Sequence, residues 1–211
     1  MQIAIPLFDR FTALDAVGPY EMLCRLPGSE VVLVADRPGP VTNDRGDLSL
    51  VATASYDAVP RPDVVVVPGG PGQGARMDDE ALLGWLRAAD AATTWTTSVC
   101  TGSLLLGAAG LLKGREATSH WLALDVLASL GAHPTGRRVV TDGKYVTAAG
   151  VSSGIDMGLT LVGRIAGDDH ARAVQLLTEY DPQPPYDAGA PDKAPAHLVE
   201  EFRTRSRFVL T

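Results

Sequence analysis

Short, continuously apolar runs alternate along this chain with segments of helical periodicity. The runs are Gln2–Phe8, Ser29–Ala35, Asp63–Val67 and Thr94–Val99. Strands without a polar face are typical of parallel sheets that helices cover on both sides. Leu14–Leu26 and Asp78–Ala91 lie between these runs, and their periodicity predicts helices. The alternation predicts an α/β fold, a flavodoxin-like doubly wound, mostly parallel sheet.

The start of the first helix is the least regular part of this pattern. Thr12 is a candidate N-cap and Gly28 a stop signal. The Gly18-Pro19 pair predicts that the helix proper begins late, with Pro19 near its first turn. This places Asp15 in the connection after the first strand.

The rest of the chain adds a hairpin excursion, further helices and a proline-rich segment. Residues 36–59 predict a short hairpin outside the main sheet, and Asp142-Gly143 predicts a second hairpin between Arg137–Thr141 and Lys144–Ala148. We expect a short strand at Glu116–Ser119 and helices at Trp121–Leu130, Ser153–Ala166, His170–Tyr180 and His197–Phe208. Pro182–Pro195 must run as an extended surface segment. No linker suggests a boundary, so residues 1–211 are interpreted as one domain.

Composition and charge narrow the class of protein. Apolar residues make up 45% of the 211 residues, enough for a sizeable core. The net charge of −7 argues against nucleic-acid binding. No apolar run approaches the length of a membrane span, and no signal peptide is evident, so we expect a cytoplasmic protein with no membrane partner. The two cysteines make no disulfide framework, and Cys24 is expected in the core.

Cys100 lies where the hydrophobic periodicity of the sequence changes from that of a strand to that of a helix. Gly102 follows two residues later, as in the nucleophile elbow of hydrolases, with Cys in place of Ser. Such a turn holds the nucleophile in a strained conformation, and the helix N-terminus favours thiolate over thiol. The alternative is an ordinary buried core cysteine. We interpret Cys100 as the nucleophile, and as the thiol that reagents modify before Cys24.

Two further groups should join Cys100 at the carboxyl edge of the sheet. Asp15 follows the first strand, and Gly69-Gly70 follows Asp63–Val67. The N–H groups of Gly70 and Thr101 would form an anion hole facing the thiolate. The alternatives are a tight turn at Gly69-Gly70 and a helix cap at Asp15.

Other chemistries are less well supported. Gly70–Ala75 matches the dinucleotide fingerprint, but the helix begins late and no acidic residue ends the next strand. Among the four histidines only His120 could approach the thiol, and a structural role is favoured for it. No spacing of Cys, His and acidic residues suggests a metal site.

Three motifs together resemble the ThiJ/PfpI superfamily, which has a class I glutamine amidotransferase-like fold. They are L-D-A-V-G-P-Y-E at Leu14–Glu21, V-V-P-G-G at Val66–Gly70 and S-V-C-T-G-S at Ser98–Ser103. Within it the chain is most similar to isonitrile hydratases, through L-G-A-A-G-L-L at Leu106–Leu112, A-T-S-H-W at Ala117–Trp121, G-I-D-M-G-L at Gly154–Leu159 and the tail Glu179–Pro191. The resemblance covers nearly the whole chain.

The resemblance implies a homodimer and a reactive Cys100, with Asp15 where the superfamily usually has Glu. It also implies a functional Thr101, at a position where peptidase-like members have His, which argues against proteolysis. The same module occurs in transcription regulators with an appended helix-turn-helix. We expect none here, because the chain ends at Thr211.

The expected activity is that of a lyase that hydrates an isonitrile to an N-substituted formamide without a cofactor. The Cys100 thiolate would attack the terminal carbon, Asp15 would deliver a proton, and Thr101 would position the water that resolves the thioimidate. We expect Asp15 to be protonated and to lower the pKa of Cys100. The alternatives are a glyoxalase- or chaperone-like stress protein and a non-catalytic small-molecule sensor.

Overall fold

The computed structural model describes residues 1–206 and is built on one seven-stranded sheet. The strand order is β10-β11-β7-β6-β1-β2-β5, and all neighbours are parallel except the β10–β11 pair. The strands are β1 (Gln2–Pro6), β2 (Glu30–Ala35), β5 (Ala54–Ser55), β6 (Val64–Val67), β7 (Trp95–Val99), β10 (Val139–Asp142) and β11 (Tyr145–Ala148). The predicted doubly wound, mostly parallel sheet is confirmed.

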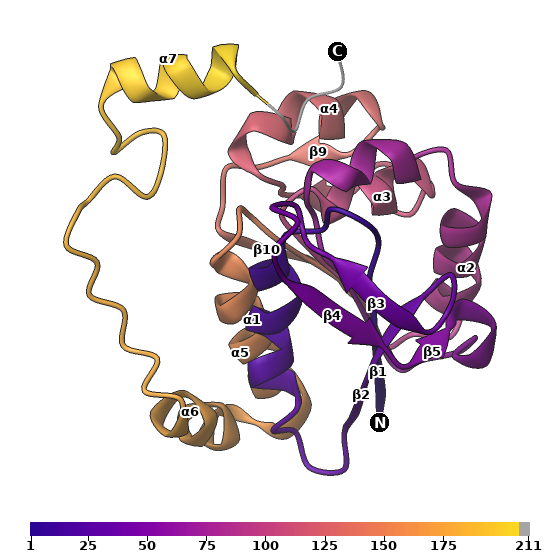
Figure 1. Ribbon diagram of the computed structural model, residues 1–211. Coiled ribbons are helices and arrows are strands. Elements are labelled where there is room, and N and C mark those ends of the chain that lie inside the picture. The colour runs from indigo at the N-terminus through magenta and orange to yellow at the C-terminus, as the bar shows by residue number, and fades with distance from the viewer. Residues whose placement is uncertain (207–211) are drawn as a thin grey trace.

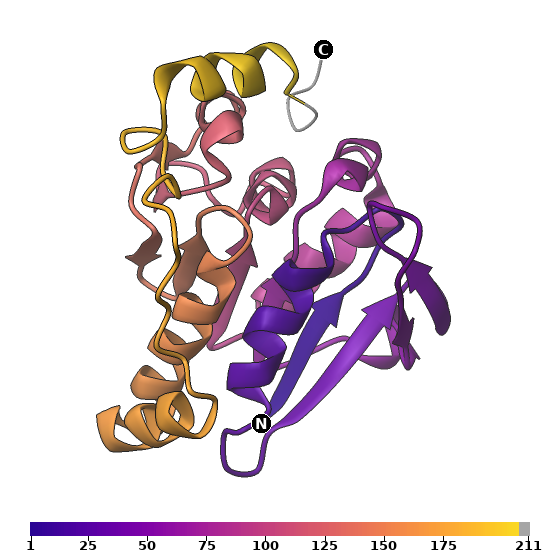
Figure 2. The same ribbon diagram turned by 60° about the vertical axis from the view of Figure 1, so that its left-hand side comes forward.

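Helices cover both faces of the sheet (Figures 1 and 2). One layer contains α1 (Ala13–Leu23) and α5 (Ser153–Ala166), which lie side by side, with α6 (Asp168–Leu177) outside them. The other contains α2 (Glu80–Asp90), α3 (Gly102–Ala108) and α4 (Leu124–Ser129). The four valines of β6 are buried at the centre of the core, as expected for a strand covered on both faces.

Smaller elements surround the main sheet. The excursion forms the predicted hairpin of β3 (Gly39–Thr42) and β4 (Ser49–Ala52), a separate antiparallel pair. A second small sheet pairs β8 (Glu116–Ala117) with β9 (His133–Pro134). Short 3-10 turns lie at η1 (Tyr56–Ala58), η2 (Pro71–Arg76) and η3 (Trp121–Ala123).

The start of α1 differs from the prediction. The helix begins at Ala13, so Asp15 lies in its first turn and Pro19 inside it. A proline there removes a helical hydrogen bond, and this cost is offset by close packing against α5. A Cβ added at Gly154 would lie 3.1 Å from Pro19 Cδ, and one at Gly158 would lie 2.8 Å from Met22 Cβ. Tertiary packing therefore stabilises a helix that the local sequence disfavours.

Residues 181–206, which we call the C-terminal arm, extend away from the sheet (Figure 1). The proline-rich part runs as an exposed, extended segment from α6, as predicted, and ends in α7 (Ala196–Thr204). In both views α7 lies near α4 (Figures 1 and 2). The predicted last helix reached Phe208, but residues 207–211 lie outside the described part of the chain.

Candidate functional site

Cys100 occupies the sharp turn between β7 and α3. Its φ of 57° is in the left-handed region that residues with side chains rarely adopt. Its N–H donates to the carbonyls of Ala148 and Ala149 at 3.1 and 3.0 Å, and its own carbonyl accepts from Ser119 Oγ at 3.0 Å. These hydrogen bonds hold the strained backbone of the turn in place, and the predicted elbow is confirmed.

The turn is possible because glycines let backbone segments touch. A Cβ at Gly102 would lie 2.1 Å from Val67 O, and one at Gly69 would lie 2.5 Å from Thr101 N. Gly70 has a φ of 135°, and a Cβ there would lie 2.5 Å from Thr12 N. The ends of β1, β6 and β7 are therefore in direct backbone contact, which brings Asp15 beside Cys100.

The Asp15 carboxyl is completely buried. Its Oδ2 accepts from Gly69 N at 2.9 Å, its Oδ1 is buried without a hydrogen-bond partner, and the Cys100 thiol lies beside the carboxyl. Burial raises the pKa of Asp15 to about 8, and the Gly69 N–H and the Cys100 thiol lower it by less. Asp15 therefore keeps its proton at neutral pH, as expected.

The pKa of Cys100 departs from the expected direction. Burial raises the pKa of the thiol well above its ordinary value, and the charge of Asp15 raises it further. The N–H groups of Thr101 and Val151 hydrogen-bond to the sulfur and lower the pKa by less. The predicted thiolate is wrong because desolvation outweighs the dipole of a short helix. The resting pair is a neutral acid beside a neutral thiol.

The expected anion hole also differs from the arrangement found. Gly70 N donates to Thr101 Oγ1 at 2.9 Å, so it is occupied by a side chain. The N–H of Thr101 interacts with the Cys100 sulfur. The structure thus brings together all four predicted residues, but Gly70 holds the Thr101 hydroxyl in place. We call Asp15, Gly69, Gly70, Cys100 and Thr101 the reaction centre.

Sequence reasoning missed two contributors. Val151 N–H reaches the thiol, and Ser119 Oγ holds the Cys100 carbonyl. The available signal was the strand Lys144–Ala148: because β11 pairs parallel with β7, its carboxyl end lies at the same edge as Cys100. The sequence had indicated only its antiparallel hairpin partner.

His120 caps the 3-10 turn η3, where its Nδ1 accepts from Leu122 N at 3.3 Å. Its ring packs on Gly150, where an added Cβ would lie 2.7 Å from His120 Cδ2. These contacts are consistent with the structural role that was favoured for His120.

Cys24 is exposed just after α1, so the prediction that it is a core residue is wrong: the helix turns its side chain outward.

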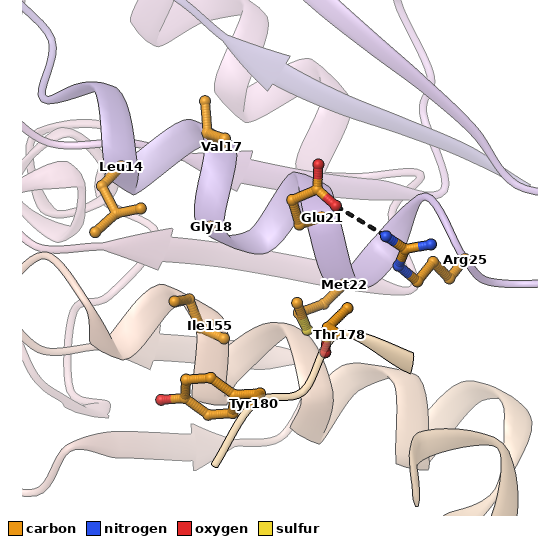
Figure 3. A pocket seen from close by; sticks show the side chains of 9 residues that line it. All are labelled: Leu14, Val17, Gly18, Glu21, Met22, Arg25, Ile155, Thr178 and Tyr180. Carbon is orange, nitrogen blue, oxygen red and sulfur yellow. Dashed lines mark hydrogen bonds and ion pairs between the residues drawn. The ribbon is translucent and has the colours of Figure 1, made fainter. Parts of the chain in front are cut away.

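Two grooves lie near the reaction centre. The smaller, of about 370 Å³, follows the outward face of α1, between Leu14, Val17 and the Glu21–Arg25 ion pair on one side and Ile155 and Tyr180 on the other (Figure 3). The larger, of about 1200 Å³, lies between the His120–Leu124 segment, residues 149–152 and the C-terminal arm.

Within residues 1–206, no group of three or more His, Cys, Asp or Glu side chains could hold a metal ion. No helix of this part is long and apolar enough to cross a membrane.

Comparisons with known proteins agree with this geometry. An isonitrile hydratase of Pseudomonas putida is 47% identical over 206 residues, which cover 98% of this chain and 90% of that protein. The transcriptional regulator CdhR of Pseudomonas aeruginosa is 34% identical over 84% of this chain, but only 53% of the regulator is matched. A crystal structure of a ThiJ/PfpI family protein from Pseudomonas syringae superposes with a TM-score of 0.94 at 42% identity, covering 97% of this chain and 85% of that one. Residues 1–164 match the DJ-1/PfpI family, and the chain belongs to that family.

Proposed function

We propose that this protein is an isonitrile hydratase, which adds water to R–N≡C to give the N-substituted formamide R–NH–CHO. The observation that carries the proposal is the completely buried pair of Asp15 and Cys100 at the strained turn, with Thr101 following the nucleophile, and burial raises the pKa of both groups. Addition of a thiol to an isonitrile places sulfur and hydrogen on the same carbon, which a neutral acid beside a neutral thiol can supply. The identity of 47% to an isonitrile hydratase over nearly the whole chain supports the same activity.

The first step forms a thioimidate. The Cys100 sulfur bonds to the terminal carbon of the isonitrile while Asp15 transfers its proton to that carbon. Asp15 then recovers a proton from the thiol, so R–N=CH–S–Cys100 forms without net proton uptake. Gly69 N, which donates to Oδ2, stabilises the carboxylate while its proton is in transit.

The second step consumes water. Its oxygen bonds to the thioimidate carbon and one of its protons goes to nitrogen. Collapse of the tetrahedral adduct then breaks the C–S bond, and the hydroxyl proton returns to sulfur through Asp15. In this proposal the Thr101 hydroxyl, which accepts a hydrogen bond from Gly70 N, orients this water. The steps balance with water as the only co-reactant, so we propose no cofactor.

The same thiol could serve a glyoxalase-like or a sensing role, and one assay separates these functions. The purified protein is incubated with cyclohexyl isonitrile and, separately, with methylglyoxal, and formamide and lactate are quantified. Formamide is the expected product. Lactate alone would indicate the glyoxalase-like function. Saturable isonitrile binding without turnover would indicate a sensor, and part of a transcriptional regulator is similar to this chain.

We further propose that the enzyme is a cytoplasmic homodimer, as the resemblance implied. Large apolar side chains are exposed at Leu14 and Tyr20 on α1, at Leu176 and Leu177 of α6, and at Val51 of the β3–β4 hairpin. A monomer that exposes so many such residues gains stability by covering them with a second copy. Light scattering at micromolar concentration tests the homodimer, and a monomer mass would refute it.

The proposed cytoplasmic location is supported by the two free cysteines, because free thiols suit a reducing compartment.

A further inference from the structure

The turn of the β3–β4 hairpin lies against the start of α1. Arg10 N donates to Thr42 O at 2.9 Å, and Asp44 N donates to Phe11 O at 2.9 Å. Phe11 and Asn43 also form an isolated parallel bridge. The hairpin pairs outside the main sheet, but its turn is therefore hydrogen-bonded to the residues that lead from β1 into α1.

The conformation of this turn is fixed by Asn43, which is buried. Its Oδ1 accepts from three backbone N–H groups, at 2.9, 3.2 and 3.3 Å, those of Gly46, Asp47 and Leu48. Its Nδ2 donates to Asp47 Oδ1 at 3.3 Å. An asparagine that bonds to the backbone of its own turn in this way restricts the conformations open to the turn. Asp44, the next residue, is half-buried and is therefore held at a defined place.

The Asp44 carboxylate is connected to the reaction centre by Thr12. Thr12 Oγ1 donates to Asp44 Oδ2 at 3.3 Å, and Thr12 N donates to Gly69 O at 2.8 Å. Thr12 O accepts from Asp15 N at 3.1 Å. Gly69 N in turn donates to the Asp15 carboxyl. A single residue thus links Asp44 both to Asp15 and to the backbone donor that Asp15 uses.

Asp15 is placed where a neighbouring charge has a large effect. Its side chain is completely buried, so charges near it are screened less than charges at the surface. Burial is the main cause of its raised pKa; of the titratable groups, Cys100 lowers that pKa and the charge of Asp44 raises it. On α5, which packs beside α1, the acidic residue of the first turn is Asp156, and it is ion-paired with Arg138. The negative charge of Asp44 therefore acts on Asp15 in the same direction as burial.

The other charged residues next to this contact are exposed. Asp9 and Arg10 follow β1, and Arg45 and Asp47 lie in the hairpin turn, where they pair with each other at 3.5 Å. Solvent screens charges in such positions. Asp47 carries the same charge as Asp44 within the same turn, so it provides a matched control.

We propose that Asp44 is a positioning residue of the reaction centre: the hairpin holds its carboxylate at the start of α1, where its negative charge favours the protonated form of Asp15. The inference rests on the proposed function for its consequence, because the Asp15 proton is the one that is transferred to the isonitrile carbon. The titration of Asp15 itself is measured without substrate, so the two proposals can fail separately.

The test is a carbon-13 NMR titration of the full chain labelled at the aspartate carboxyl carbons, with the Asp15 signal identified by its loss in Asp15→Asn. Asp44→Asn removes the charge and keeps an oxygen that can accept from Thr12. We expect the midpoint of the Asp15 titration, about 8 in the wild type, to fall by about 0.5 in pH, as for one partly screened charge. Asp47→Asn should leave the midpoint unchanged. A contact that is only structural would not move this midpoint.

Turnover of cyclohexyl isonitrile gives a second readout. The decline of kcat/KM with rising pH should begin at a lower pH in Asp44→Asn, by the same amount as the NMR midpoint. An Asp15 midpoint that is the same in Asp44→Asn and in the wild type, or that falls equally in Asp47→Asn, overturns the inference whatever the turnover. A midpoint that falls only in Asp44→Asn, in a protein that hydrates no isonitrile, supports the role of Asp44 and refutes the proposed function.

Discussion

The reaction centre and the C-terminal arm differ strongly in how far their residues are buried. Asp15, Cys100 and Thr101 have no exposed surface, and backbone groups from three strand ends hold them. Residues 181–189 of the arm are all exposed, and α7 buries none of its residues completely. The arm also lies beyond residues 1–164, the part that matches the family. The comparison shows that the residues of the reaction centre are held by the ends of the sheet strands, whereas the arm is exposed and contributes none of them.

The largest effect should come from removing the buried thiol rather than the exposed one. Cys100→Ala is expected to lower kcat by at least about 10³-fold, because no other group can form the thioimidate. Cys24→Ala is the matched control and should retain full activity, since Cys24 lies outside both grooves. Formamide production measures both. Comparable losses in the two variants would contradict the assignment of the nucleophile.

The next effect concerns the proton on Asp15. Asp15→Asn keeps an acceptor for Gly69 N but has no transferable proton, so kcat should fall by about 10²–10⁴-fold. In the wild type the pKa of about 8 predicts that activity is retained at neutral pH and falls as the pH rises through this value. The residual activity of Asp15→Asn should lack this decline. A wild-type profile that rises through pH 8 would instead indicate that the active form requires a deprotonated pair.

A smaller effect, on stability, should distinguish a glycine of the elbow from a glycine in an outer helix. Gly102→Ala would place a Cβ 2.1 Å from Val67 O, and we expect the free energy of unfolding to fall by about 3 kcal/mol or more. Gly84→Ala in α2 is the control, because the nearest atom to its Cβ is the flexible Glu80 Oε1 at 3.6 Å. It should gain about 0.5–1 kcal/mol from helix propensity. Urea unfolding measures both, and equal effects would show that the elbow tolerates side chains.

The smallest effect should lie in the arm. Lys193 pairs with Asp187 at 2.9 Å, and both side chains are exposed. Solvent screens such pairs, so Lys193→Ala should leave the thermal unfolding transition unchanged. A clear drop in Tm would mean that the arm is held more firmly than its exposure indicates.

Much of the architecture follows from sequence because apolar runs and helical periods are local signals. Six strands of the main sheet, the β3–β4 hairpin, the elbow and the pairing of Asp15 with Cys100 were predicted. The two-residue strands β5 and β9 were not, and the prediction that all of residues 36–59 lie outside the main sheet was wrong, because β5 pairs with β2. Two further predictions that were wrong concern properties that depend on residues distant in sequence. The late start of α1 was wrong because Gly154 and Gly158 of α5, distant in sequence, let Pro19 pack inside a helix. The thiolate was wrong because its pKa depends on burial, which no local motif specifies.

The short strands at the margins of the sheet limit how the molecule can associate. At one edge β5 has only two residues, and at the other β8 lies beside β10, where Glu116 N donates to Asp142 Oδ2 at 2.9 Å. Neither margin offers a long row of unpaired backbone groups, so growth by strand addition is disfavoured. In the proposed homodimer we therefore expect the two copies to meet through helices and side chains rather than by continuing the sheet.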